Sequence, residues 1–191
     1  MTEETQPWRV CGIAGSLRAG SFNRSLLRAA KELAPPALEV TIFDALIDVP
    51  MFNADVEAEG DPAGVMALKD AIAAADGLLL VTPEYNAGIP GPMKNAVDWA
   101  SRRYRDGAPV LKGKPAAIMG ATPGRLATAR AQANLRVTLA NTGAIVMDGP
   151  QVHVMGARER IVDGELVDED SWKFVSRLLE AFADWIGRFS D

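Results

Sequence analysis

Five short apolar runs, separated by helix-length segments, constrain the fold of this chain more than any other feature. The runs span residues 8–14, 38–43, 77–82, 116–120 and 144–147. The third run has no polar alternation, which is typical of a strand that is covered on both faces. Strands that alternate with helices form a parallel sheet with right-handed crossovers. The sequence therefore predicts an α/β fold with a five-stranded, doubly wound parallel sheet.

Helical periodicity fills the segments between these runs. Helices are predicted over residues 21–34, from residue 61 onward, and over 92–102, 125–140 and 171–189. Asp61 is expected to cap the second helix, with Pro62 in its first turn, and residues 44–61 are expected to be irregular. The last helix carries an apolar stripe that ends at Phe189, which indicates core or subunit contact.

Length and composition are those of a single domain over residues 1–191, since 191 residues with 48% hydrophobic content can bury a substantial core. The net charge of −5 and the absence of a long like-charge run disfavour a nucleic-acid surface. The single cysteine, Cys11, excludes an internal disulfide and fits a reducing cytosol. Residues 1–7 are unlike a secretory signal, and the apolar stretches are too short to cross a bilayer. We therefore expect a cytoplasmic protein with no membrane or nucleic-acid partner.

The loop after the first run has the composition of a phosphate site. It reads GSLRAGSFN over residues 15–23. The glycine spacing of a P-loop is present, but Ser21-Phe22 replaces the Lys-Ser/Thr pair that a nucleoside triphosphate requires. The hydroxyl, amide and cationic side chains that remain are Ser16, Arg18, Ser21 and Asn23. They open a helix, whose free N–H groups attract a phosphate monoester; helix capping by Ser21 or Asn23 is a compatible structural alternative.

The loop after the third run suits a flat polar ring. It reads PEYNAGIPG over residues 83–91, and its glycines and prolines predict a rigid shape. Tyr85 supplies an aromatic ring and Asn86 an amide, although a structural turn with a half-buried Tyr85 would use the same residues. Both loops follow strands, so we expect them to meet at the carboxyl edge of the sheet. Together they predict a site for flavin mononucleotide (FMN).

These two segments resemble motifs of the NADPH-dependent FMN reductase family, in particular of its bacterial quinone and chromate reductase branch. GSLRAGSFNR, residues 15–24, resembles the phosphate motif, and TPEYNAGIPGPMKNAVDWASR, residues 82–102, resembles the flavin-ring motif. Weaker likeness extends through residues 49–53, 120–132 and 153–156 into the last helix. The resemblance implies a flavodoxin-like fold with strand order 2-1-3-4-5.

By this resemblance, residues of both motifs and of one later loop would bind FMN. The phosphate motif contributes Ser16, Arg18, Ser21, Phe22 and Asn23, and the ring motif contributes Pro83, Glu84, Tyr85 and Asn86, largely through main chain. Residues 121–124 depart from the family, which often has serine there, so that Thr122 would supply the hydroxyl. Residues 158–160, Arg-Glu-Arg, are more charged than the family pattern and have no assigned role.

The resemblance also implies the reaction. NADPH or NADH would reduce FMN, and electrons would then pass to a quinone, chromate, azo compound or similar small acceptor in a ping-pong cycle. No catalytic acid–base pair and no metal site are expected. His153 has no local Ser, Cys or carboxylate partner and is expected to be structural. Cys11 is expected to pack as a small hydrophobe, and the acidic residues of 44–59 lack metal-ligand spacing.

Basic residues are expected near the mouth of the crevice, where they would attract the 2′-phosphate of NADPH or an anionic acceptor. They are Arg18, Arg102, Arg103, Arg105 and Arg125. Arg125 is the best candidate, and surface solubility is the alternative for each. The family also implies a homodimer or homotetramer, with Trp99 at an interface or in the core.

Two other classes of protein remain open at this point. A flavodoxin-type carrier would pass single electrons without oxidising NAD(P)H, although such carriers are usually more acidic than a net charge of −5. A non-catalytic module with the same fold would bind no FMN. Reduction of a bound flavin by NADPH distinguishes the three.

Overall fold

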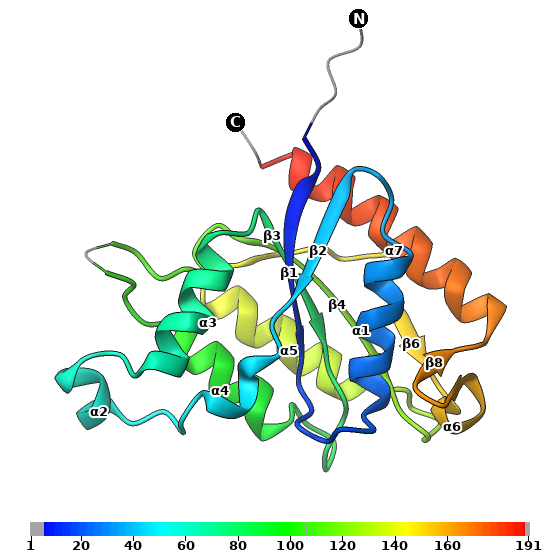
Figure 1. The fold of residues 1–191 in the computed structure, drawn as a ribbon, viewed down its shortest axis with the longest axis horizontal. Helices are drawn as coiled ribbons and strands as arrows, with labels where there is room; N and C mark the ends of the chain where they lie inside the picture. The colour runs from blue at the N-terminus through cyan, green and yellow to red at the C-terminus, as the bar shows by residue number, and fades with distance from the viewer. Residues whose placement is uncertain (1–5, 106, 190–191) are drawn as a thin grey trace, which may run out of the picture.

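A parallel sheet runs through the centre of the molecule and is covered by helices on both faces (Figure 1). The computed structural model describes residues 6–105 and 107–189; residues 1–5, which form most of the polar amino-terminal segment, lie outside the described residues. The strands of this sheet are β1 (Trp8–Ala14), β2 (Leu38–Ile42), β3 (Gly77–Val81), β4 (Pro115–Ala121), β5 (Ile145–Val146) and β6 (Val152–Val154). The order of the first five, β2-β1-β3-β4-β5, confirms the predicted α/β topology, and β6 adds a sixth strand that pairs with β4.

The helices divide between the two faces of the sheet. They are α1 (Phe22–Glu32), α2 (Ala54–Glu59), α3 (Ala63–Ala73), α4 (Gly91–Ala100), α5 (Ala129–Asn141), α6 (Ala157–Arg160) and α7 (Glu169–Gly187), with a 3₁₀ turn η1 (Ala45–Asp48). Helices α1 and α7 share one core, and α3, α4 and α5 share the other. All five residues of β3 are buried, as its unbroken apolar sequence predicts. Each fully buried leucine or isoleucine contributes about 1.5–3 kcal/mol to this core.

The prediction that residues 44–61 are irregular was wrong. They contain η1 and α2. Helix α2 has no buried residue, so its sequence lacks the apolar stripe from which a helix is predicted. Asp61 does not cap α3, which begins at Ala63 with Pro62 at the N-cap. The Asp61 carboxylate instead lies 2.6 Å from Nζ of the fully buried Lys69. Asp61 pairs with Lys69 and does not cap the helix, because a buried ammonium without a charged partner is strongly destabilising.

Residues 49–61 form an arm that leads to α2 at the lower left of Figure 1, away from the sheet. Helix α4 fixes the base of this arm. Trp99 Nε1 and Asn95 Nδ2 both donate to the Pro50 carbonyl oxygen, at 2.8 and 2.9 Å, and Asn95 Oδ1 accepts from Phe52 N–H. Trp99 is fully buried and therefore belongs to the core.

Later elements differ from the prediction mainly at their ends. The helix predicted from residue 125 begins at Ala129, because Ala127 and Thr128 have left-handed backbone with φ of 44° and 66°. The strand predicted over 144–147 shortens to β5, and β6 pairs with the second half of β4. A small antiparallel pair, β7 (Ile161–Val162) and β8 (Glu165–Leu166), precedes α7.

The apolar stripe of α7 is buried from Val175 to Ile186 against the sheet, but Phe189 lies beyond the helix and is 44% exposed. Arg160, in the charged segment that had no assigned role, pairs with Asp168 at the start of α7 at 2.6 Å. No helix among the described residues is long and apolar enough to cross a membrane.

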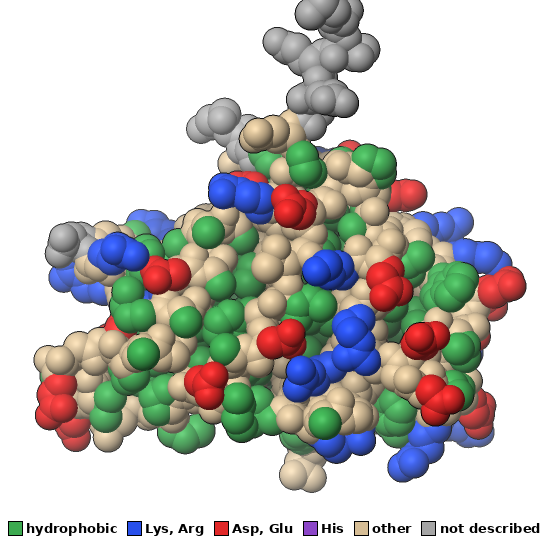
Figure 2. Space-filling view, viewed as in Figure 1, with side chains coloured by type: hydrophobic (Ala, Val, Ile, Leu, Met, Phe, Trp, Pro, Cys, Tyr) green, Lys and Arg blue, Asp and Glu red, His purple; other side chains and the backbone are tan. Residues whose placement is uncertain are grey.

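The two ends of the fold lie at one edge of the sheet, and the loops that follow the strands lie at the other. β1 begins and α7 ends at the top of Figure 1, while the loops after β1 and β3 lie at its lower edge. On the face shown in Figure 2, basic and acidic side chains are interspersed, and basic ones gather over α1.

Candidate functional site

Three loops meet at the carboxyl ends of the central strands. We call them the β1 loop (residues 15–21), the β3 loop (residues 82–91) and the β4 loop (residues 122–128). Strand β1 lies between β2 and β3, so the chain order reverses there, and open α/β sheets bind ligands at such a point.

The β1 loop presents free main-chain donors beside a helix start. Within the described part of the chain, the N–H groups of residues 16–20 form no hydrogen bond. The Ser21 N–H donates to the Arg18 carbonyl at 3.1 Å, and Ser21 Oγ caps α1 by accepting from Asn23 N–H at 3.2 Å. The first turn of α1 contains no acidic residue. Free N–H groups and the positive end of a helix fit a phosphate monoester.

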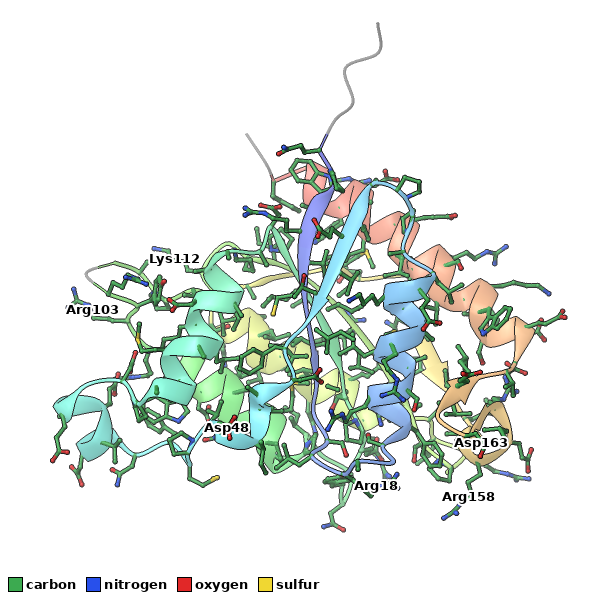
Figure 3. All side chains as sticks on the ribbon, viewed as in Figure 1. Arg18, Asp48, Arg103, Lys112, Arg158 and Asp163 are labelled. Carbon is green, nitrogen blue, oxygen red and sulfur yellow. The ribbon has the colours of Figure 1, made fainter. Side chains whose placement is uncertain are left out.

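Arg18 adds a full positive charge at this place. The guanidinium is exposed and lies over the Phe22 ring, 5.5 Å from its centroid. None of the ion pairs among residues 6–105 and 107–189 includes Arg18. Figure 3 shows it at the lower edge, near the start of α1. Its charge is therefore available to an anion in the β1 loop.

Asn23 is engaged elsewhere. Its Nδ2 donates to the Ala121 carbonyl oxygen at 2.9 Å, and its Oδ1 accepts from the Ala121 N–H at 2.9 Å. The side chain is buried and joins the first turn of α1 to the end of β4. Asn23 thus holds the β1 loop in place and does not turn its amide towards that loop.

The β3 loop contains a tight two-residue turn. Tyr85 and Gly88 exchange both main-chain hydrogen bonds, at 3.2 and 3.0 Å, around Asn86 and Ala87. Both central residues are left-handed, with φ of 49° and 64°, as in a type I′ turn. Asn86 is exposed at the tip, where an asparagine tolerates this backbone. The turn residues of the loop therefore form a compact two-residue turn closed by two main-chain hydrogen bonds.

Tyr85 connects the two loops directly. Its Oη lies 3.3 Å from Ser16 Oγ, and the tyrosine is 48% exposed while Ser16 is buried. Pro83 is buried, and its carbonyl oxygen accepts from Thr82 Oγ1 at 2.8 Å. The half-exposed ring therefore places an apolar surface beside the free N–H donors of the β1 loop.

Glu84 is turned away from the open edge. Its carboxylate accepts hydrogen bonds from the first turn of α5 and pairs with Arg130. Sequence reasoning placed Glu84 in the site but missed Arg130, since no local pattern marks an arginine at the second position of a helix.

The β4 loop supplies the third wall of the candidate site. Thr122 is half-buried, its N–H donates to the Val154 carbonyl at 3.0 Å, and its Oγ1 accepts from Gly124 N–H at 3.4 Å. Arg125 is exposed, and no ion pair of the described residues includes it. The loop therefore brings one hydroxyl and one unpaired cation to the edge.

The other expected cations do not gather here. Arg102 pairs with Glu57 at 2.8 Å and Arg105 with Asp70 at 3.0 Å. Arg103 lies to the left in Figure 3, well away from Arg18. The expectation that Arg102, Arg103 and Arg105 lie at the crevice mouth was wrong, because Arg102 binds the arm, Arg105 binds α3 and Arg103 lies away from Arg18.

His153 and Cys11 have structural surroundings, as predicted. The two ring nitrogens of His153 lie 3.1 Å from the Ala127 carbonyl oxygen and 3.1 Å from Gln151 Oε1. Burial raises the pKa of the Cys11 thiol to about 12, which keeps it protonated and unreactive.

A cavity of about 230 Å³ borders the β1 loop on the side of β2. Ser16 and Leu17 form one wall, and Arg24, Phe43 and Asp44 lie among the residues of the others. Arg24 Nη2 pairs with Asp44 at 3.2 Å across it. The candidate site is thus open at the sheet edge and has a cavity beside the free N–H donors of the β1 loop.

Comparison with known proteins agrees with this geometry. Residues 8–159 match the NADPH-dependent FMN reductase family. An NAD(P)H-dependent FMN reductase of Pseudomonas aeruginosa is 40% identical over 181 residues, 94% of this chain and 96% of its own length. A quinone reductase of Escherichia coli is 40% identical over 192 residues, 98% of each chain.

A solved structure agrees as well. The flavoenzyme FerB, an NAD(P)H:(acceptor) oxidoreductase of Paracoccus denitrificans, superposes with a TM-score of 0.85 at 38% identity, covering 95% of this chain and 98% of its own. The family resemblance of the two loop motifs is therefore confirmed. This chain belongs to the NADPH-dependent FMN reductase family.

Proposed function

We propose that this protein oxidises NAD(P)H with FMN bound at the β1, β3 and β4 loops and passes the electrons to a small acceptor. The observation that carries the proposal is the set of free donors in the β1 loop, with Arg18 beside them and Tyr85 Oη 3.3 Å from Ser16 Oγ. A phosphate and a flat ring would each find matching groups in these adjoining loops. As a member of its family, the chain is an NAD(P)H- and FMN-dependent oxidoreductase.

The residues would divide the work as follows. Ser16, Ser21, Phe22 and Arg18, with the main chain of residues 16–22, hold the phosphate. Pro83, Tyr85, Asn86 and the main chain of Glu84 line the ring, and Thr122 faces it from the β4 loop. Asn23 keeps α1 against β4. FMN, when bound, supplies the hydride acceptor and the electron store, so that no side chain needs to act as a catalytic acid or base.

A quinone is the acceptor that the relatives favour, because the Escherichia coli protein is a quinone reductase. The open edge beside Tyr85 would admit a planar molecule after the nicotinamide leaves, which corresponds to a ping-pong cycle. Chromate, azo compounds and other small acceptors belong in the same test.

We also propose a cytoplasmic homodimer or homotetramer built from single-domain chains, with no nucleic-acid or membrane partner. The exposed arm supports this assembly, because α2 has no buried residue although α4 holds the arm rigidly. A second copy would cover it. Light scattering of the purified protein measures the assembly.

Anaerobic stopped-flow mixing tests the function. The FMN-loaded protein is mixed with NADPH or NADH, and the flavin absorbance near its visible maximum is followed. We expect rapid bleaching, and recovery of the absorbance when a benzoquinone is added. Free FMN without protein is the control. No bleaching over minutes would contradict the proposal and favour an electron carrier, and a protein that binds no FMN would favour a non-catalytic module.

A further inference from the structure

Glu84 lies in the β3 loop, yet its side chain is only 8% exposed and faces α5. Its Oε2 accepts from the main-chain N–H of Arg130 at 3.0 Å and of Ala131 at 3.2 Å. Its Oε1 accepts from Arg130 Nε at 2.8 Å and from Arg130 Nη2. All these donors belong to the first turn of α5. One carboxylate therefore joins the β3 loop to the helix that follows the β4 loop.

Helix α5 has no cap of its own. Thr128 stands at its N-cap position with φ 66° and makes no side-chain capping bond, and Ala127 before it has φ 44°. Left-handed backbone is unfavourable for residues that carry a Cβ, and the free N–H groups of a helix start need acceptors. Glu84 supplies the acceptors from another loop, so the entrance to α5 depends on the β3 loop.

The residues around Thr128, at the start of α5, are tightly packed. Gln132 Nε2 donates to Thr128 Oγ1 at 3.0 Å. A Cβ at Gly120 would overlap both Thr128 Oγ1 and the Thr82 carbonyl oxygen. Thr128 is thus packed against Gly120 of β4, and the β4 loop is confined at the end that Glu84 supports.

Glu84 and Arg130 form an ion pair of opposite charges. Burial by itself would raise the pKa of Glu84, but the hydrogen bonds from Arg130 and Ala131 and the charge of Arg130 together hold the pKa below its usual value. Arg130 neutralises the carboxylate, and the start of α5 adds a partial positive charge. Removal of either partner alone would leave one charge uncompensated beside the β3 loop.

The geometry points to Glu84 as a positioning residue, which with Arg130 fixes the β3 loop against the β4 loop and balances the charge beside the flavin held between them. This inference rests on the proposed function. Glu84 contributes its main chain to the ring and its carboxylate to α5, so it acts on the flavin through the loops that it joins.

Two substitutions, which remove charges of opposite sign, test the inference. Glu84→Gln keeps an acceptor oxygen but removes the negative charge, whereas Arg130→Met removes the positive charge and leaves the main-chain donors of α5 to Glu84. We expect Glu84→Gln to weaken FMN binding by about tenfold. Removal of a residue that hydrogen-bonds to a metal ligand, and so orients it, weakens metal binding by a similar factor. Glu84→Gln should also raise the midpoint potential of bound FMN, because a net positive charge favours the reduced flavin. Arg130→Met should lower that potential.

Fluorescence titration of the apoprotein with FMN and a redox titration of the loaded protein measure these effects. Asp168→Asn is the matched control, because Asp168 also caps a helix and pairs with an arginine, at 2.6 Å from Arg160, but does so at α7. It should lower the unfolding temperature and leave FMN affinity and potential unchanged.

Opposite potential shifts in the two variants would support the inference, since damage to the fold alone would shift both in one direction. Shifts of the same sign, or wild-type affinity and potential in both, would overturn it. Arg130→Met carries the test if Glu84→Gln does not fold. A wild-type protein that binds no FMN would refute the proposed function instead. Hydrogen exchange of the apoproteins then tests the positioning role. Faster exchange over residues 122–128 in Glu84→Gln than in the wild type would support it, and equal exchange would overturn it.

Discussion

Ser16 and Arg18 add side-chain donors to a loop whose main-chain donors are already free. The Ser16 hydroxyl is buried beside Tyr85, and the Arg18 guanidinium is exposed over Phe22. A phosphate in the β1 loop would gain a hydrogen bond from the hydroxyl and a stronger, charge-assisted one from the guanidinium. Neither side chain belongs to the apolar core, so their loss should change ligand affinity and leave the fold intact.

The double variant Ser16→Ala with Arg18→Ala tests whether these side chains bind the phosphate without supporting the fold. A hydrogen bond to a charged group contributes about 1.5–3 kcal/mol, so we expect the FMN dissociation constant to rise by about ten- to a hundredfold. Fluorescence quenching during FMN titration measures it. Arg177→Ala, which removes an exposed charge from α7, should bind FMN as the wild type does. Unchanged affinity in the double variant would refute the phosphate assignment.

Gly120 is required for steric reasons. A Cβ there would overlap the Thr82 carbonyl oxygen and Thr128 Oγ1, one of which is rigid main chain. We expect Gly120→Ala to lower the free energy of unfolding by about 1–3 kcal/mol, the usual cost of overpacking. Urea unfolding measures it. Gly91→Ala is the control, because a Cβ at Gly91 meets nothing within 4 Å; equal stability of both variants would contradict the packing argument.

Residue types at the site were predictable, but their partners were not. Asn23 bonds with Ala121, 98 residues away, and Glu84 with Arg130, 46 residues away. Local sequence patterns show which side chains can donate or accept, whereas the fold decides which of them meet. The same limit explains why Arg102 and Arg105 were expected at the site and instead bind Glu57 and Asp70.

At the scale of elements, the start of α7 is held by a charged cap. Asp168 accepts from Ser171 N–H at 2.8 Å and from Arg160 at 2.6 Å. The Ser171 hydrogen bonds foremost, and then the charge of Arg160, hold the pKa of Asp168 below its usual value despite partial burial. A lowered pKa in the folded state means that the carboxylate stabilises the protein only while it is ionised.

The pH dependence of Asp168→Asn follows from this sign. Above the unfolded carboxyl pKa, about 3.9, the wild type should be more stable than the variant by a constant amount of about 1 kcal/mol, since asparagine also caps helices. As the pH falls below about 4 and approaches the lower folded pKa, that difference should shrink. Unfolding by urea at several pH values measures it. A difference that grows on acidification would show the opposite linkage.

Long elements were predictable from periodicity, and short ones were not. β1, β3, α1 and α7 carry enough apolar residues at regular spacing to be located within a few positions. Helix α2 buries nothing, and β7 and β8 have two residues each, so none of these three elements leaves a periodic signal. Strand β5 also has two residues, but the apolar run over residues 144–147 predicted it. Helix α5 starts late because Ala127 and Thr128 adopt a backbone that alanine and threonine rarely take.

For the whole molecule, the three loops of the candidate site extend from strands β1, β3 and β4 of one sheet. A ligand that binds them should therefore stabilise the entire fold, because unfolding of the sheet destroys its site. At an FMN concentration of 100 times the dissociation constant, we expect about 2.7 kcal/mol of added stability. Thermal unfolding with and without FMN measures it, and riboflavin, which lacks the phosphate, is the control. Equal stabilisation by both would show that the β1 loop does not bind the phosphate.

The placement of the chain ends bears on how the protein can be handled. β1 begins and α7 ends at the edge of the sheet opposite the three loops (Figure 1). An affinity handle, a fluorescent fusion or a surface linker attached at either end is therefore kept clear of the loops. Protein tethered to an electrode in this way would present its open face to the solution, within reach of dissolved nicotinamide and acceptor.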